Sequence, residues 1–236
     1  MEEQLHKMFP QARVLRMDAD TTRTRESYEK ILAAFARGDA DILVGTQMIV
    51  KGHDFPAVTL VGVLAADLSL SMSDYRAGER TFQLLTQAAG RAGRGSRPGE
   101  VVIQTYQPDH YSIQTAKEQN YEAFYEQEIL YREMMLYPPV WNMLVVLCAS
   151  KWEQTAYDCA AKLAEQISGE RKVQVIGPAD AAVAKVNDIY KKVLYLKAED
   201  YGKLVEIKNR LEHFMRDNRV FSDTIVQFDF NPVNGF

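Results

Sequence analysis

Two arginines interleaved with two glycines form the most chemically informative stretch of this 236-residue sequence. Residues 87–94 read Q-A-A-G-R-A-G-R, so Arg91 and Arg94 lie three residues apart, on one side of a helix end or of the loop after it. The glycines carry no side chain, which lets the guanidinium groups approach a ligand closely. Guanidinium forks suit phosphate oxygens. The octapeptide therefore predicts a phosphate contact, and a solvated turn is the ordinary alternative for a short glycine-arginine loop.

The elements that must position these arginines alternate between strand and helix patterns over residues 1–107. Apolar runs that read as strands lie at 14–17, 41–44, 58–64 and 101–104, and those at 41–44 and 58–64 fit strands buried on both faces of a parallel sheet. Helical patterns lie at 28–35, ended by Gly38, and at about 74–89, and the first five residues also favour a helix. This alternation predicts an α/β doubly wound lobe. Ligands of such sheets gather at the carboxyl ends of strands, which Thr46 and Asp67 closely follow.

The remainder of the chain has a different pattern. Residues 108–132 read as an acidic helical connector, and Tyr137-Pro138-Pro139 breaks the helix. Beyond the prolines, strands are predicted at 143–147, 173–176, 190–196 and 225–230, with helices at about 152–167 and 201–215. We expect Gly177-Pro178 to end the second of these strands. The order β-α-β-β-α-β predicts an α+β sandwich with helices on one face of an antiparallel or mixed sheet.

Composition limits the class of protein. The net charge of −4 argues against a generally basic nucleic-acid coat, so any DNA contact is expected to be local. The sequence has no apolar run that would span a bilayer and no basic-then-apolar leader. Cys148 and Cys159 have no C-x-x-C grouping and cannot form a zinc site alone. We interpret them as reduced core residues of a cytoplasmic protein.

Three ordered segments carry a family resemblance. The pattern Q-x-x-G-R-x-G-R resembles motif VI of superfamily 2 helicases, in the second of their two RecA-like lobes. Residues 74–85, D-Y-R-A-G-E-R-T-F-Q-L-L, are similar to the segment leading into motif VI in the PriA family of primosomal replication-restart helicases. Residues 45–56, G-T-Q-M-I-V-K-G-H-D-F-P, resemble the family's motif V. The resemblance is dense over 10–106 and thinner beyond, where Val140 stands in place of the family's usual aromatic residue.

The resemblance implies a domain organisation. Residues 1–107 are expected to be the later part of a RecA-like second helicase lobe, 108–132 a helical connector, and 133–236 a smaller α+β domain. In the family this last domain is similar to a small ribosomal-subunit protein that binds RNA and partners. The sequence contains neither G-x-x-x-x-G-K-[ST] nor D-E-x-H, which the family needs on its first lobe. We therefore expect a fragment that starts after a zinc module and ends at the natural carboxyl terminus.

Motif VI resemblance assigns three residues to catalysis in the intact enzyme. It implies that Arg94 is an arginine finger for the γ-phosphate of ATP, that Arg91 binds the same phosphates, and that Gln87 orients the attacking water. The structural alternative is that the three residues are surface groups capping a helix.

Motif V resemblance assigns a DNA and a nucleotide contact. It implies that Thr46, with the amide groups after it and Gln47, binds a backbone phosphate of the translocated strand. Gly52 and Asp54 are expected near the nucleotide, with Asp54 at a ribose hydroxyl. A helix N-cap is the alternative role for Thr46, and His53 is interpreted as packing or loop chemistry.

Lys191 and Lys192 lie beside Tyr190 and Tyr195 in the carboxy-terminal part of the sequence. Aromatic rings interleaved with lysines can stack bases and neutralise phosphates, which makes the two lysines candidate DNA contacts. A solvated strand face is the ordinary alternative.

Two further charged pairs have a structural interpretation. Asp18 and Asp20 follow a strand, where a solvated or helix-capping loop is favoured over a metal site because no further acid is near. Arg76 and Arg80 lie one helical turn apart, and we favour pairing with neighbouring acids such as Glu79 over a DNA contact.

The resemblance as a whole implies part of an ATP-dependent 3′–5′ DNA helicase that restarts stalled replication forks and assembles the primosome. ATP and Mg²⁺ are implied for the intact enzyme, with Zn²⁺ in the upstream module. Expected partners are DNA forks and single strands, single-strand-binding protein and other primosome proteins, with no membrane, in the bacterial cytoplasm near the nucleoid. The rival hypothesis is a non-catalytic DNA- or protein-binding scaffold, above all for residues 133–236. A metabolic α/β enzyme would need a glycine-rich phosphate loop after the first strand, which is absent.

Overall fold

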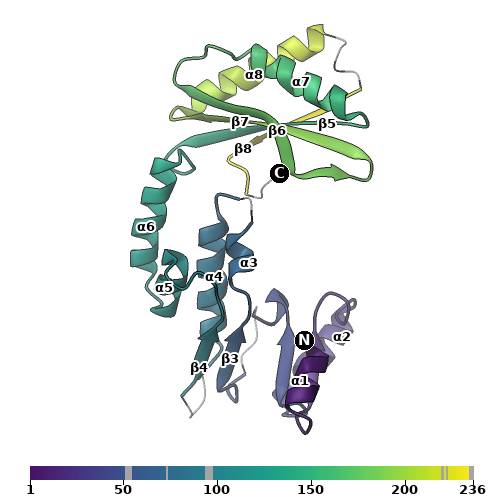
Figure 1. Ribbon diagram of the computed structural model, residues 1–236, viewed down its shortest axis with the longest axis vertical. Coiled ribbons are helices and arrows are strands. Elements are labelled where there is room, and N and C mark those ends of the chain that lie inside the picture. Colours follow the sequence, from purple (N-terminus) through teal and green to yellow (C-terminus); the bar gives the residue numbers. More distant parts are fainter. Residues whose placement is uncertain (51–54, 73, 94–97, 219–220, 222, 234–236) are drawn as a thin grey trace. The chain divides into compact units, whose positions relative to one another are not determined.

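The computed structural model describes residues 1–50, 55–72, 74–93, 98–218, 221 and 223–233 of the chain (Figure 1). The chain divides into two compact units. The first comprises Met1–Leu68 and Arg80–Asn120, and the second comprises Ser69–Glu79 together with the chain from Tyr121 onward. The second unit therefore includes a short segment from the middle of the predicted lobe. The domain boundaries at 107 and 132 stay predictions.

The first unit consists of short parallel strands and helices in alternation. Its elements are α1 (Glu2–Met8), β1 (Val14–Met17), α2 (Arg25–Ala36), β2 (Ile42–Gly45), the 3₁₀ helix η1 (Gln47–Val50), β3 (Leu60–Val63), β4 (Glu100–Ile103) and α5 (Tyr111–Lys117). Two helices, α3 (Asp67–Leu70) and α4 (Ala77–Ala89), have residues in both units. Strand β1 pairs in parallel with β2, and β3 pairs in parallel with β4.

The sheet of this unit differs from the one predicted. The sequence predicted one parallel sheet with helices on both faces, whereas the described residues form two separate two-stranded sheets. The strand predicted at 58–64 is also not buried on both faces, since Leu60 is 60% exposed. On its neighbour β4, Val102 is 51% exposed. Each strand has only four residues and one hydrogen-bonded neighbour within the described chain. An apolar run shows that a strand is suited to burial, but it does not determine which elements pack on the two faces of that strand.

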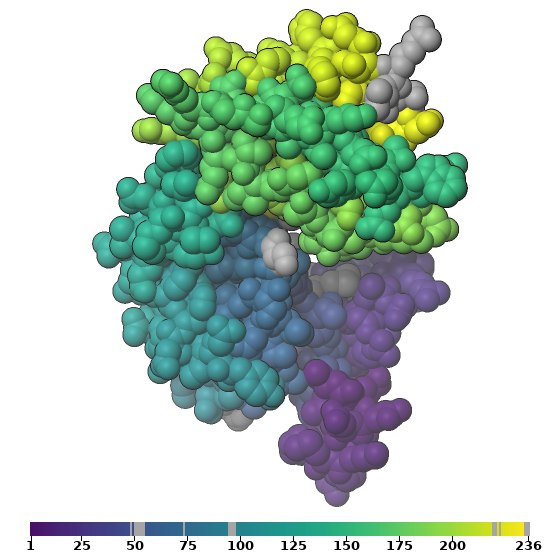
Figure 2. Space-filling model, turned by 45° about the horizontal axis from the view of Figure 1, so that its top comes forward, coloured from purple at the N-terminus to yellow at the C-terminus, as the bar shows by residue number. Residues whose placement is uncertain are grey.

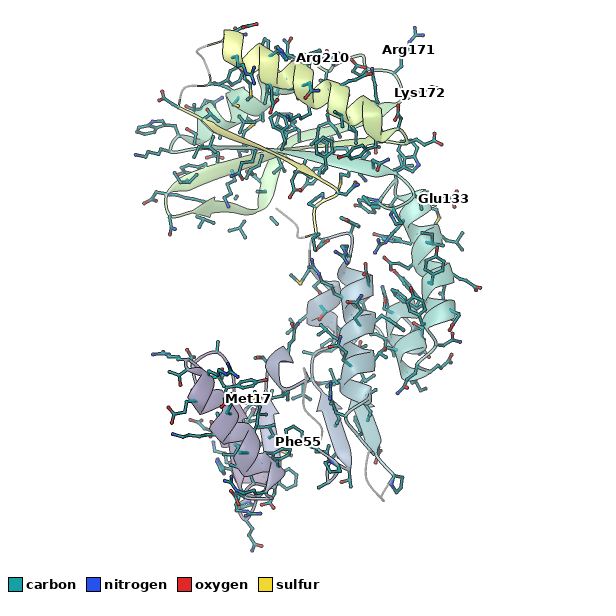
Figure 3. All side chains as sticks on the ribbon, turned by 180° about the vertical axis from the view of Figure 1, so that it is seen from behind. Met17, Phe55, Glu133, Arg171, Lys172 and Arg210 are labelled. Atoms are coloured by element: carbon teal, nitrogen blue, oxygen red, sulfur yellow. The ribbon has the colours of Figure 1, made fainter. Side chains whose placement is uncertain are left out.

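Helix α2 shows how local sequence forms one element of this unit. Thr24 caps the helix, because its hydroxyl accepts from the Ser27 N–H while the Ser27 hydroxyl accepts from the Thr24 N–H. The helix packs the ring of Phe35 edge-on against Phe55, with 5.0 Å between centroids. Met17 at the end of β1 is fully buried, and Figure 3 labels it together with Phe55.

The second unit contains a four-stranded antiparallel sheet covered by two helices. Its elements are α6 (Tyr121–Met134), β5 (Asn142–Ser150), α7 (Glu153–Glu165), β6 (Val173–Val186), β7 (Ile189–Ala198), α8 (Tyr201–Asp217) and β8 (Ile225–Phe230). The strand order is β6-β7-β5-β8, and α7 and α8 lie side by side on one face of the sheet (Figures 1 and 2). This is the β-α-β-β-α-β order that the sequence predicted.

A single apolar core joins that sheet face to the two helices. Most of its buried members come from β5, β7, α7 and α8, and they include Leu144, Val146, Leu163, Leu194, Leu204, Ile207 and Leu211. Cys148 and Cys159 belong to this core, where both are buried and free, with 3.4 Å between their sulfur atoms. Their assignment as reduced core residues is consistent with this arrangement.

One predicted strand end in this unit is wrong. Strand β6 continues through Gly177-Pro178 to Val186 instead of ending there. A shift in register between Ile176 and Ala179 accommodates the two residues. Proline lacks an N–H, but β6 is an edge strand, so the missing donor interrupts no second ladder.

Candidate functional site

Helix α4 positions the two motif VI residues that the structure describes. Its buried side carries Phe82, Leu85 and Ala88. Gln87 is exposed in the last turn, and Arg91 is half-buried just past the helix end. Backbone hydrogen bonds from Gly90 to Thr86 and from Arg91 to Ala88, each 3.0 Å, continue the turn beyond Ala89. Gln87 and Arg91 are thus four residues apart on a continuous helical turn, where side chains lie on the same face.

The charge on this turn comes from the side chains and not from the helix. The carboxyl end of a helix has a partial negative charge, which disfavours a phosphate. Any phosphate near this turn must therefore be held by guanidinium groups. Arg94, the predicted finger, lies outside the described residues.

The glycines after Arg91 have a structural reason of their own. Gly93 has a φ of +74°, and its N–H donates to the Val58 carbonyl at 3.1 Å. A Cβ atom on Gly93 would lie 2.6 Å from the nitrogen of Gly99, and a Cβ atom on Gly99 would lie 2.2 Å from the nitrogen of Gly93. Two backbone segments cross here at a distance that excludes side chains. The sequence attributed the glycine to ligand approach, whereas the described contact is between backbones.

Motif V begins at the carboxyl end of β2. Thr46 directly follows that strand and is exposed, and its carbonyl accepts the Ile49 N–H at 3.2 Å, which starts η1. Gln47 is the exposed first residue of η1. This is an open strand end of the kind at which α/β sheets bind ligands. Gly52 and Asp54, as well as His53, lie outside the described residues.

The loop after β1 uses its carboxylate internally. Asp18 accepts hydrogen bonds from the N–H groups of Asp20 and Thr21, each at 3.1 Å, and pairs with the guanidinium of Arg16. The Thr21 N–H and Arg16 lower the pKa of Asp18. Asp18 therefore organises a polar turn. Among the described residues, no group of three or more acidic, histidine or cysteine side chains is arranged to hold a metal.

Asp67 has a role that the sequence did not indicate. Its carboxylate accepts the Thr105 hydroxyl at 2.7 Å and the Tyr106 N–H at 2.9 Å. These bonds, with the Tyr106 N–H first, lower the pKa of Asp67. The side chain thus ties the chain after β3 to the chain after β4. Its position near a strand end, which suggested ligand chemistry, is explained by this bridge.

The two candidate lysines of the second unit lie on opposite faces of β7, because neighbouring strand residues alternate. Lys192 is 10% exposed and forms ion pairs with Glu153, at 2.9 Å, and with Asp180. A phosphate at Lys192 would have to replace these carboxylates. Lys191 is half-buried, and the ring of Tyr190 lies 4.7 Å from the Lys185 ammonium.

Arg76 was predicted to pair with a neighbouring acid, and it does, whereas the pairing predicted for Arg80 stays a prediction. The Arg76 guanidinium binds both oxygens of Glu79 at 3.0 and 3.1 Å. Glu79 also binds Arg132 of α6 at 2.7 Å, a contact across 53 residues that sequence spacing does not reveal. No helix within the described part of the chain has the length and apolar character to cross a membrane.

Comparisons with known proteins agree with the residues quoted above. Residues 1–96 match the family described as Helicase conserved C-terminal domain, and residues 133–233 match Primosomal protein N C-terminal domain. The replication restart protein PriA of Bacillus subtilis (strain 168) is 43% identical over 98% of this chain and 29% of its own length. The Synechocystis protein of that name is 43% identical over 98% of the chain and 28% of its own length. The Treponema pallidum protein is 34% identical over 99% of the chain and 35% of its own length. The chain thus spans about a third or less of these relatives.

Proposed function

Because the chain belongs to the PriA family of replication restart proteins, we propose that it forms part of an ATP-dependent 3′–5′ DNA helicase. The intact enzyme would restart stalled replication forks and assemble the primosome. It would use ATP and Mg²⁺, with Zn²⁺ in a module upstream of these residues. Its partners would be forked and single-stranded DNA, single-strand-binding protein and primosome proteins, in the bacterial cytoplasm. Residues 1–107 would be the second helicase lobe, 108–132 a connector and 133–236 a DNA- and partner-binding domain.

The observation that carries this proposal is the turn at the end of α4. Gln87 and Arg91 share one face of that turn, and Arg94 follows Arg91 by three residues in the sequence. In our proposal Arg94 contacts the γ-phosphate bound to the other lobe, where its guanidinium neutralises charge that develops during phosphoryl transfer. Arg91 would hold the same phosphates, and the Gln87 amide would orient the attacking water.

Motif V would couple that chemistry to DNA. Thr46 and Gln47 stand at an open strand end, where a hydroxyl and backbone N–H groups can bind a phosphate of the translocated strand. Gly52 and Asp54 would approach the nucleotide. Closing and opening of the cleft between lobes would then move the DNA contact stepwise with each ATP.

A binding scaffold without motor action is the second candidate for residues 133–236. The supporting observation is that the second unit uses its charged groups in ion pairs, such as those of Lys192 and Glu170. In that case the second unit would supply partner contacts only, and the arginine turn of the first unit would still serve the motor.

Arg94→Ala in the intact helicase tests the proposal. We expect DNA-stimulated kcat for ATP hydrolysis to fall at least about a hundredfold, with DNA affinity nearly unchanged, because a finger acts on charge in the transition state. Arg25→Ala is the matched control, since Arg25 is an exposed arginine of α2. Lost DNA binding with normal hydrolysis would instead make Arg94 a DNA contact. The 236-residue chain alone, which has no Walker lysine motif, should release no phosphate from ATP.

A further inference from the structure

The segment Asp74–Glu79 precedes the motif VI turn, and the proposed chemistry gives it no role. In the structure it belongs to the second unit. The ring of Tyr75 stacks on that of Tyr137, with 5.3 Å between centroids and 23° between planes. The Tyr75 hydroxyl donates to the carbonyl of Pro232 at 3.0 Å. Through Tyr75 the segment therefore contacts two parts of the chain that follow α6, at Tyr137 and at Pro232.

Arg132 of α6 is the centre of this attachment. It is 10% exposed, and its three nitrogen atoms donate to three different acceptors: Nε to Glu128 at 2.7 Å, one terminal nitrogen to the Pro138 carbonyl at 3.0 Å, and the other to Glu79 at 2.7 Å. Its guanidinium also lies 5.4 Å from the centre of the Tyr75 ring. Charge-assisted hydrogen bonds to three separate acceptors fix the position of a guanidinium group closely.

Two cations hold the Glu79 carboxylate from different elements. Arg76 binds it from the preceding loop, and Arg132 binds it from α6. Glu79 is 22% exposed, so water screens these pairs only partly. Lys197 completes the cluster, because its ammonium lies 3.8 Å from the Tyr137 ring centre and donates to the Met135 carbonyl at 2.8 Å. Cations thus contact both rings of the tyrosine stack.

Glu79 and the motif VI turn are on the same helix. Glu79 lies in the first turn of α4 and Gln87 in its last, within one uninterrupted helix of 13 residues. The rise and the turn per residue of an α-helix are regular, so the direction of its first turn sets the direction of its last. Fixing the Glu79 end therefore constrains the direction of the end that carries Gln87 and Arg91.

We propose that Glu79 and Arg132 are positioning residues for the motif VI turn, which they orient by fixing the first turn of α4 against α6. This inference rests on the proposed role of that turn in ATP hydrolysis. It assigns the buried Arg132 cluster a part in the motor. Neither residue touches the reacting atoms.

Glu79→Gln in the intact helicase is the direct test, since it removes the charge and keeps the size of the side chain. We expect DNA-stimulated kcat to fall on the order of tenfold, while KM for ATP and the affinity for a single-stranded oligonucleotide change less than about twofold. Glu79→Asp keeps the charge and should retain an intermediate kcat. The Asp variant also decides the question if the Gln variant does not fold: a kcat equal to wild type would then overturn the proposal.

Glu170→Gln is the matched control. Glu170 is also a carboxylate held by two cations, Lys203 at 2.9 Å and Arg210 at 2.6 Å, and it lies in the second unit on the connection between α7 and β6. Figure 3 labels Arg210 with the nearby Arg171 and Lys172. A role in stability alone predicts that the Glu79 and Glu170 variants lower Tm and leave kcat unchanged. Our proposal predicts a loss of kcat for Glu79→Gln only.

The double variant Glu79→Gln with Arg94→Ala separates this inference from the proposed function. If Glu79 acts through the motif VI turn, the double variant should hydrolyse ATP within about twofold of Arg94→Ala alone. Multiplication of the two losses would overturn the inference and leave the finger intact. If Arg94→Ala itself has no effect, the proposed function is wrong, whatever Glu79 does.

Discussion

The two units of the chain bury their strands to different degrees. In the second unit, β5 is buried at every position from Met143 to Ser150. In the first unit, β3 and β4 each alternate between exposed and half-buried residues. The candidate catalytic and DNA-binding residues nevertheless concentrate in the first unit, on helix and strand ends. The unit with the sparse core thus carries the proposed chemistry, and the unit with the closed core carries few of the candidate residues.

This difference separates stability from function along the chain. Apolar side chains that stay exposed on β3 and β4 contribute little to stability, because burial supplies the free energy. Contact with another protein surface would bury these side chains and would then supply that free energy. The second unit needs no such cover, since two helices already close one face of its sheet. Substitutions should therefore act differently in the two units, and three measurements test this.

The largest difference is expected between two leucines. Leu204 of α8 is fully buried, so Leu204→Ala should lower the free energy of unfolding by about 3–4 kcal/mol. Leu60→Ala on β3 should lower it by less than about 1 kcal/mol, because that side chain is already largely solvated. Urea unfolding followed by far-ultraviolet circular dichroism measures both losses, because each unit contains helices and strands. Equal losses would mean that the two cores do not differ.

The Glu79 cluster should make the second unit sensitive to acid. Hydrogen bonds from Arg76, and then from Arg132, lower the pKa of Glu79 from 4.5 to about 2. Because the folded pKa is the lower one, the stabilisation is complete above pH 4.5 and is lost as pH falls toward 2. Between pH 6 and pH 3 the wild-type protein should lose about 2 kcal/mol of its free energy of unfolding through this group. Glu79→Gln should therefore lose less stability than wild type over that range in urea unfolding, whereas Glu133→Gln at an exposed position should behave as wild type.

The smallest effect concerns the only DNA contacts predicted for the second unit. We expect Lys191→Gln to reduce the slope of log affinity against log salt by about 0.7 on a single strand, as for one phosphate contact. Lys192→Gln should leave the slope nearly unchanged, because Glu153 and Asp180 already neutralise that lysine. Fluorescence anisotropy of a labelled oligonucleotide measures both. A drop of about 1.4 for the double variant would mean that Lys192 exchanges its carboxylates for phosphate. Unchanged slopes for both would return the pair to a solvated strand face.

The sequence predicted elements wherever a local pattern was sufficient. The spacing of Tyr28, Ile31 and Phe35 predicted α2, and that of Leu204, Ile207 and Leu211 predicted α8. Local pattern failed at β6, because the effect of Pro178 depends on whether its strand lies at the edge of the sheet. It also failed to predict how the strands of the first unit pair, since pairing between strands is a property of tertiary structure.

The candidate site was predictable as a motif but not as a set of contacts. Gln87 and Arg91 were found by residue type and spacing, and the structure describes the first as exposed and the second as half-buried. The pairing of Glu79 with Arg132, and of Asp67 with Thr105, joins residues 53 and 38 positions apart. Nothing in the neighbourhood of either residue encodes its distant partner. Such contacts depend on how whole elements pack.

The length of helix α4 determines how far its carboxyl end moves when its first turn changes direction. Its 13 residues span about 20 Å at 1.5 Å per residue. A tilt of about 5° at the Glu79 end would move the far end by roughly 2 Å, and a displacement near 1 Å is enough to cost about a hundredfold in an aligned reaction. A small change in direction at Glu79 is therefore a larger displacement at the far end of α4. Two guanidinium groups bind the Glu79 carboxylate and restrict such changes. The longer the helix between Glu79 and the arginine turn, the more closely its first turn has to be fixed.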